Sequence, residues 1–270
     1  MNKTDIEWAD MTWNPVTGCL HGCSYCYARR AATRFGLEYA PRLGDPGMEG
    51  ARKYDSEEGI DTMLELVKPY EKDGRRQPYP MGFLPTFHRY RLDEPRQTKK
   101  PQNIFVGSMT DLFGDWIPDS WISEVFAACE KAPQHRYLFL TKNPDRYTRL
   151  ALADKLPMED NFWYGSTATD PDMTFWWSEG HNTFASFEPL LAPFKPVEGG
   201  GTCRLNWAII GAMTGPEASK HKPKKEWVDT IVNEASAVGV PVFMKDSLIQ
   251  IVGEENMRRE FPWEKGAQRI

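Results

Sequence analysis

Short apolar runs recur along the chain from residue 104 onward, and segments with apolar residues at helical spacing separate them. The runs are rich in Ile, Val, Phe and Tyr and do not alternate strictly with polar residues, which is typical of parallel strands buried on both faces. We therefore predict strands at 104–107, 137–141, 162–166, 183–187, 207–211 and 240–244. Segments 119–132 and 225–238 are predicted helices, with Asp119 as the N-cap of the first.

This alternation of strand and helix predicts an α/β fold built from repeated β/α units. An open doubly wound sheet and a full or partial (β/α) barrel both fit it, and periodicity does not separate them. In either topology the carboxyl ends of the strands form the active face. Polar residues follow several predicted strands there, at 108–111, 141–143, 166–170, 188 and 213–214. Simple helix capping is the alternative role for these residues.

Residues 36–100 break the rhythm, with Pro and Gly, no clean strand, and at most a short helix around 56–67. We interpret this stretch as an insertion after the first β/α unit of a single domain that spans residues 1–270. Insertions at the active face commonly contact substrate.

The formal net charge of −5 conceals a basic stretch inside this insertion. Residues 68–100 hold nine Lys or Arg and four Asp or Glu, a local net charge of +5, together with five Tyr or Phe. Basic residues interleaved with aromatic ones are typical of nucleic-acid-binding segments, so Arg89 and Arg91 are candidate substrate contacts. A solvated loop is the alternative.

No stretch approaches the roughly 20 apolar residues of a membrane-spanning helix, and the N-terminus lacks the apolar run of a signal peptide. We therefore expect a cytoplasmic protein that does not enter a membrane. In that reducing compartment the five cysteines are not expected to form disulfides, and metal or redox chemistry is the better explanation.

Three of those cysteines lie within eight residues, in GCLHGCSYCYARR (18–30), with the spacing C-x3-C-x2-C. Cys19, Cys23 and Cys26 can bind one iron–sulfur cubane from a single loop, and Gly18 and Gly22 give the backbone the freedom to do so. Three protein ligands leave one iron open for a small molecule. Zinc is the competitor, with His21 as a fourth ligand.

The motif C-x3-C-x-aromatic-C, formed by Cys19, Cys23, Tyr25 and Cys26, resembles the hallmark of the radical S-adenosylmethionine superfamily. The resemblance implies a [4Fe–4S] cluster, S-adenosylmethionine bound at the open iron, and a 5′-deoxyadenosyl radical that abstracts hydrogen from the substrate. It implies a reductant such as flavodoxin or ferredoxin as a partner. It also implies a full or partial (β/α) barrel with the cluster loop after the first strand, which would lie within 6–13.

Further blocks narrow the resemblance to a phage-associated branch of radical S-adenosylmethionine-like proteins. They are the opening TDIEWADMTWNPVTGC, FVGSMTDLF (105–113), YLFLTKNPDRY (137–147), SFEPLL (186–191) and IIGAMTG (209–215). This chain has Ala-Met-Thr at 212–214 where that branch has Gly-Glu-Ser, so no glutamate role carries over there. A phage-encoded protein would act in the host cytoplasm.

By analogy with the superfamily, the residues that end the second strand bind the methionine amino group, which designates Gly107, Ser108 and Met109, with Asp111 nearby. Further candidate cofactor contacts are Lys142, Ser166, Thr167 and Glu188, and each has a purely structural alternative, which for Glu188 is an ion pair with Lys142 or Arg146.

Two isolated cysteines lie outside the motif. Cys129 falls on an apolar helical face and is expected to be a buried small hydrophobe. Cys203, in GGGTC, is too isolated to predict an auxiliary cluster, and a role as hydrogen donor to a substrate radical stays open.

Two classes of function follow. The first is a radical enzyme that modifies or isomerises a nucleic-acid base or a base-linked amino acid, with a peptide or small metabolite as the other possible substrates. The second is an iron–sulfur or zinc module that binds nucleic acid without radical chemistry. Substrate, product, fate of the cofactor and oligomeric state are not determined by the sequence.

Overall fold

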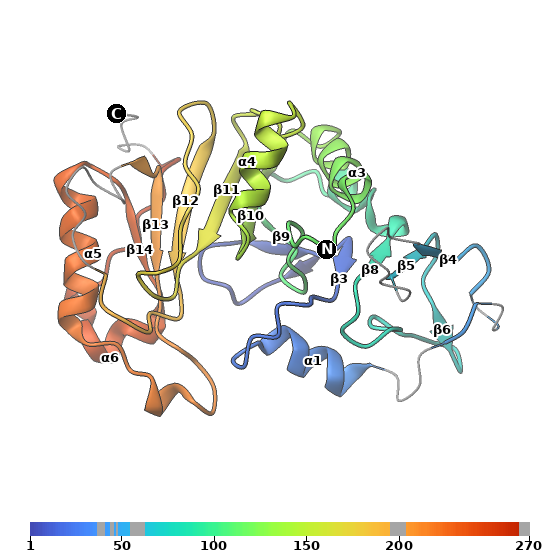
Figure 1. Cartoon of the computed structure of the whole chain (residues 1–270), viewed down its shortest axis with the longest axis horizontal. Helices are drawn as coiled ribbons and strands as arrows, with labels where there is room; N and C mark the ends of the chain where they lie inside the picture. The colour runs from blue at the N-terminus through green and yellow to red at the C-terminus, as the bar shows by residue number, and fades with distance from the viewer. Residues whose placement is uncertain (37–40, 44–45, 47, 55–62, 195–203, 265–270) are drawn as a thin grey trace. The chain divides into compact units, whose positions relative to one another are not determined.

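The structure, a computed structural model, describes residues 1–36, 41–43, 46, 48–54, 63–194 and 204–264. Its contacts divide the chain into two compact units. The first comprises Met1–Arg146 and Leu150–Pro157, and the second comprises Tyr147–Arg149 and Met158–Ile270. Figure 1 shows the helices and strands of both.

The main sheet strands of the first unit are β1 (Asn2–Lys3), β2 (Met11–Trp13), β9 (Asn103–Val106) and β10 (Arg136–Thr141), in that order. β1 is antiparallel to β2, whereas β2, β9 and β10 are parallel. β2 lies within the range 6–13 expected for the first strand. Because Met11 pairs with Ile104, the residues that follow β2 and those that follow β9 come to the same end of the sheet, although about 90 positions separate them.

The stretch 36–100 forms strands where we expected none. Three of them, β8 (Thr86–His88), β5 (Met63–Leu66) and β4 (Arg52–Tyr54), join β3 (Val16–Thr17), which precedes the stretch, in a four-stranded sheet of order β3-β8-β5-β4. In addition, β6 (Glu71–Lys72) pairs with β7 (Arg75–Arg76). The expected helix around 56–67 is wrong for 63–66, which is β5, and its residues 55–62 lie outside the described part of the chain. The segment η1 (Arg89–Arg91) and the short helix α2 (Glu94–Gln97) follow β8.

Three longer helices belong to the first unit or straddle its boundary: α1 (Tyr27–Phe35), α3 (Asp119–Glu130) and α4 (Asp145–Leu152). The predicted helix at 119–132 is confirmed by α3, which buries Trp121, Val125 and Cys129 on its apolar face. Asp119 is not its N-cap. Pro118 holds that position, and the Asp119 carboxylate instead accepts hydrogen bonds from Arg146 and Lys155 at 2.8 Å each.

The second unit contains four parallel strands in sequence order: β11 (Phe162–Thr167), β12 (Asn182–Phe187), β13 (Trp207–Ile210) and β14 (Val242–Met244). Every residue of β11, β13 and β14 is buried, as expected for strands covered on both faces. Helix α5 (Lys225–Ala237) buries Val228, Ile231 and Ala235, which lie on one face at helical spacing. The remaining elements are η3 (Ala218–Lys220), η4 (Asp246–Leu248), α6 (Ile249–Val252) and η5 (Glu254–Asn256).

The α/β class and the six strands predicted from residue 104 onward are therefore confirmed, and the helix predicted at 225–238 is α5. The barrel of the radical S-adenosylmethionine type and the single domain stay predictions. Among the described helices, none has the length and apolar composition that crossing a membrane requires.

Candidate functional site

The three clustered cysteines lie in a loop between β3 and α1, residues 18–26, which we name the cysteine loop. Cys19, Cys23 and Cys26 are each half-buried. The loop ends where Cys26 becomes the N-cap of α1, with its sulfur accepting a hydrogen bond from the Arg29 main-chain N–H at 3.3 Å. Gly18 has φ +90°, and a Cβ there would come within 2.2 Å of the Leu84 carbonyl oxygen, so only glycine fits.

The segment that follows β9 holds this loop against the end of the main sheet. The Gly18 N–H donates to the Met109 carbonyl at 2.9 Å, and the Thr110 hydroxyl donates to the Gly18 carbonyl at 2.6 Å. Farther along, the Tyr27 hydroxyl donates to the Ser108 carbonyl at 2.7 Å. Polar groups of the segment expected to bind the methionine amino group thus bond to the cysteine loop and α1.

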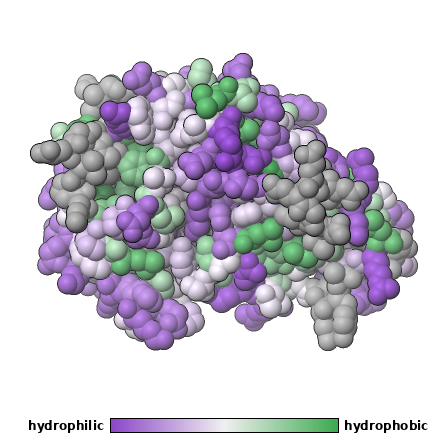
Figure 2. Space-filling view, in the orientation of Figure 1, coloured by the Kyte–Doolittle hydropathy of each residue, from purple (hydrophilic) through white to green (hydrophobic). Residues whose placement is uncertain are grey.

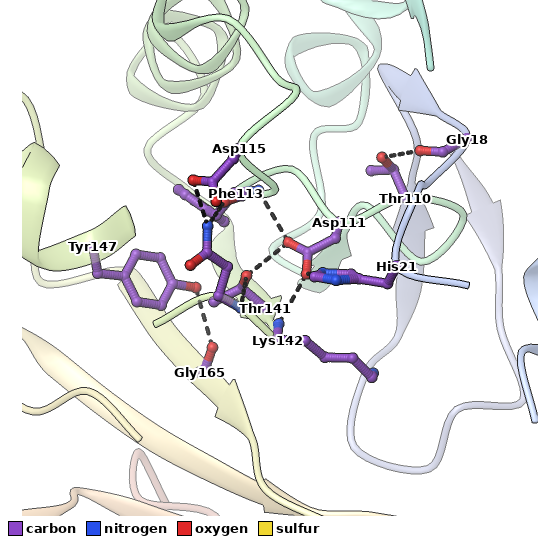
Figure 3. A network of polar contacts seen from close by, with 11 residues as sticks. Gly18, His21, Thr110, Asp111, Phe113, Asp115, Thr141, Lys142, Tyr147 and Gly165 are labelled. Carbon is purple, nitrogen blue, oxygen red and sulfur yellow. Dashed lines mark hydrogen bonds and ion pairs between the residues drawn. The ribbon is translucent and has the colours of Figure 1, made fainter. Parts of the chain in front are cut away.

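Asp111 extends this anchorage to the loop's own imidazole (Figure 3). One carboxylate oxygen accepts from Phe113 N at 3.1 Å and Thr141 Oγ1 at 2.7 Å, and the other accepts from His21 Nε2 at 2.7 Å and Lys142 N at 2.8 Å. Burial alone would raise the pKa of Asp111, but the hydrogen bonds, above all that from His21, outweigh it and hold the pKa below its ordinary value.

These four hydrogen bonds decide the role of Asp111. A carboxylate has about four acceptor positions, and all are taken by donors of the protein. Asp111 is therefore a positioning residue that joins the cysteine loop to the ends of β9 and β10, and its contact with the cofactor stays a prediction. The His21 ring also packs edge-on against Trp116, with centroids 4.8 Å apart.

The thiols of the loop lie within electrostatic reach of one another. Burial raises the pKa of Cys19 to about 11, the His21 main-chain N–H opposes this, and the negative charges of Asp111, Cys23 and Cys26 raise it further. The described residues contain no group of three His, Cys, Asp or Glu already arranged to hold a metal ion. The donor set nonetheless fits an iron–sulfur cluster chemically, because three mutually repelling thiolates on one loop are stabilised by a cationic centre.

Another predicted residue, Lys142, lies beside Tyr25 of the loop. Lys142, directly after β10, places its ammonium 5.8 Å from the centroid of the Tyr25 ring. Since the main-chain N–H of Lys142 is bonded to Asp111, its backbone is fixed while its charged end faces the cysteine loop. The structure thus brings Tyr25, Lys142 and the three cysteines into one neighbourhood of the first unit.

The other predicted cofactor residues belong to the second unit. Ser166 and Thr167 are buried at the end of β11, where Ser166 Oγ accepts from Trp176 N at 3.0 Å. Glu188, after β12, pairs with Lys245 at 2.5 Å, and Gly211 packs against its carboxyl group, where a Cβ would come within 3.0 Å.

Lys245 was not singled out from the sequence, although its position directly after β14 is the signal that applied to Lys142. Arg146, the other partner considered for Glu188, pairs with Asp119 in the first unit. Cys129 is fully buried in α3, as expected, and burial raises its pKa well above the ordinary value. Cys203 lies outside the described residues.

The two arginines proposed to contact substrate have structural partners. The Arg89 guanidinium bonds to both Glu65, at 2.5 and 3.1 Å, and Glu124, at 2.8 and 2.9 Å. Arg91 donates to the Asn14 carbonyl at 2.9 Å. These bonds link η1 to β5, to α3 and to the segment after β2, and the contact of the two arginines with substrate stays a prediction.

Comparison with known proteins adds one match. A family described as "Protein of unknown function (DUF5131)" matches residues 3–259. No curated protein and no solved structure matches the chain.

Proposed function

The chain belongs to the DUF5131 family, and we propose that it is a radical S-adenosylmethionine enzyme whose [4Fe–4S] cluster is held by Cys19, Cys23 and Cys26. The observation that carries the proposal is the cysteine loop itself. Three half-buried thiols in C-x3-C-x2-C spacing lie on one loop, anchored by hydrogen bonds to the segment after a parallel strand. Three ligands leave one iron of a cubane open.

When bound, the cluster and S-adenosylmethionine supply a 5′-deoxyadenosyl radical that takes a hydrogen atom from the substrate. The chain's own residues bind and orient. The three thiolates hold the cluster, and Asp111 fixes His21 and the end of β10. Lys142, whose ammonium lies beside Tyr25, is the proposed partner of the cofactor carboxylate.

The remaining cofactor contacts and the barrel are parts of the same proposal. Gly107, Ser108 and Met109 are proposed contacts of the methionine amino group, and the carbonyls of Ser108 and Met109 also accept hydrogen bonds from Tyr27 and Gly18. The contacts with the cofactor predicted for Ser166, Thr167 and Glu188, which lie at strand ends of the second unit, are kept as part of the proposal. Parallel strands and a cysteine loop that follows β2 and β3 support the radical S-adenosylmethionine barrel.

One observation favours a second candidate, a closed zinc site without radical chemistry. His21 donates one ring nitrogen to a carboxylate, as zinc-bound histidines do, which leaves Nδ1 as a ligand beside the three thiols. We favour the cluster because a zinc site would require this single loop to supply all four bonds, whereas structural zinc usually draws ligand pairs from separated places.

A nucleic-acid base or a base-linked amino acid is the substrate we propose, on the strength of the resemblance, with a reductant such as flavodoxin or ferredoxin as electron donor. We further propose that the protein works in the cytoplasm, where thiols stay reduced.

The test is cofactor cleavage by protein purified without oxygen. After reduction with dithionite, the wild type and a Cys129→Ala variant are expected to release 5′-deoxyadenosine from S-adenosylmethionine, whereas Cys23→Ala is expected to release none. Cys129 is the matched control because it is a buried cysteine of α3. Absence of 5′-deoxyadenosine from an iron-loaded wild type would rule out the radical mechanism.

A further inference from the structure

The surface beside the cysteine loop combines two segments without any acidic residue. Residues 11–36 and 74–92 contain seven arginines and no Asp or Glu, although the whole chain has a net charge of −5. The two segments contact each other, since β3 pairs with β8, Cys19 N donates to the Phe83 carbonyl at 3.1 Å, and Arg29 lies over the Phe83 ring. Arg76 and Arg89 pair with carboxylates, so the positive charge beside the loop comes from the arginines of α1.

Helix α1 presents these charges outward. Arg29, Arg30 and Arg34 are exposed, whereas Arg89 and Arg91 are engaged inside the fold. Two aromatic rings of the same helix are also exposed, Tyr27 by 53% and Phe35 by 57%. Hydrophilic and hydrophobic residues accordingly lie close together in Figure 2 where Figure 1 places α1.

We propose that the exposed face of α1 binds single-stranded nucleic acid. The further step, that this nucleic acid is the enzyme's substrate, rests on the proposed function. Arginines neutralise phosphates, and exposed rings stack on bases irrespective of sequence. An acidic protein would be met by the arginines alone and would not use the exposed ring surface of Tyr27 and Phe35. Arg34 lies 5.3 Å from the centroid of the Phe35 ring, so charge and stacking surface occur together.

The position of α1 connects binding to chemistry. The helix begins at Cys26, and Arg29 Nη2 donates to the Cys19 carbonyl at 3.1 Å, so the basic face is continuous with the loop that would hold the cluster. A nucleic-acid strand bound along α1 would bring one of its bases to this loop. A single-stranded base needs no extrusion from a duplex to approach it.

The experiment measures binding of a fluorescein-labelled single-stranded DNA of about 20 nucleotides to the full chain by fluorescence anisotropy. Arms with RNA and duplex DNA of the same sequence distinguish the kinds of nucleic acid. The double variant Arg30→Glu/Arg34→Glu is expected to weaken binding about tenfold or more. The slope of log K, the association constant, against log salt concentration between about 50 and 200 mM is negative, and its magnitude should decrease by about 1.4 because two phosphate contacts are lost. Phe35→Ala is expected to weaken binding about fivefold or more.

The matched control is Lys222→Glu/Lys224→Glu, which makes the same charge change at exposed positions of the second unit and is expected to bind as the wild type does. Equal binding by Arg30→Glu/Arg34→Glu and the wild type would overturn the inference, as would preference for duplex. Slower reduction by flavodoxin with unchanged oligonucleotide binding would overturn it too, in favour of a docking face for a redox protein.

Cofactor cleavage, measured in parallel with dithionite, separates this inference from the proposed function. Cleavage without oligonucleotide binding by the wild type would reject the α1 face and leave the radical mechanism standing. Binding at α1 without iron or cleavage would reject the radical mechanism and the substrate role, and would leave a nucleic-acid-binding surface.

Discussion

Replacing Asp111 with alanine is expected to release the cysteine loop from the sheet and to lower the free energy of unfolding by about 3–5 kcal/mol. The variant leaves buried N–H groups of Phe113 and Lys142 and the Thr141 hydroxyl without their acceptor, and it frees the His21 ring. Urea unfolding measures the loss of unfolding free energy. Release of the cysteine loop is measured by the iron bound per chain after anaerobic reconstitution, which should fall well below that of the wild type.

The contribution of Asp111 should also depend on pH in a definite direction. Its pKa in the folded protein lies below the ordinary value of 3.8, so the unfolded chain takes up the proton first as the pH falls. The stabilisation is therefore complete above about pH 5 and is lost as the pH falls through the folded pKa. An Asp111→Asn variant should differ most from the wild type near neutral pH and least at the acid end.

Asp115→Ala is the matched control for Asp111. Asp115 lies in the same segment and bonds to Asn143, but its side chain is 63% exposed, so its loss should cost less than about 1 kcal/mol and leave iron binding intact. If Asp111→Ala and Asp115→Ala lost equal stability and kept equal iron, Asp111 would not be the anchor of the loop.

Replacing Arg89 with methionine is expected to cost about 3–5 kcal/mol of unfolding free energy, because it leaves the buried Glu65 charge with only Arg52, an exposed residue 3.8 Å away, as a cationic partner. The Glu65 side chain is only 8% exposed and accepts from Arg89 and from Trp121 Nε1, the latter at 2.7 Å. Adding Glu65→Gln to Arg89→Met should restore part of the loss, since the amide removes the charge and can still accept from Trp121. Urea unfolding of the two variants measures both effects.

Arg96→Met provides the comparison for Arg89. Arg96 pairs with Asp93, but both side chains are more than 60% exposed. The free energy of unfolding should therefore fall by less than about 1 kcal/mol in Arg96→Met. A stable Arg89→Met protein with weakened nucleic-acid binding would contradict the structural role and support the prediction that Arg89 contacts substrate.

The sequence was most informative where both faces of a strand are buried. Such strands are continuous apolar runs, which is why β11 and β13 were predicted within one residue of their bounds. The prediction from sequence missed β5, where Glu65 interrupts the apolar pattern. That charge is compensated by Arg89 and Trp121, which lie 24 and 56 positions away, and no local pattern reveals such partners.

The same limit applies to the candidate site. The spacing of the cysteines and the position of Lys142 after a strand both follow from local sequence. The role of Asp111 does not, because His21 is 90 positions away and saturation of the carboxylate depends on four donors from three segments. Asp119 is not the cap because the helix already begins at this residue, after Pro118, and its carboxylate bonds to Arg146 and Lys155, which lie 27 and 36 positions away.

Iron, sulfide and zinc analysis of the anaerobically purified chain tests the central claim most directly. If the thiolates of Cys19, Cys23 and Cys26 hold an iron–sulfur cubane, the wild type should contain about four irons and four sulfides per chain. The Cys23→Ala variant should lose them. One zinc per wild-type chain, without sulfide, would contradict the account and show a closed tetrahedral site in its place.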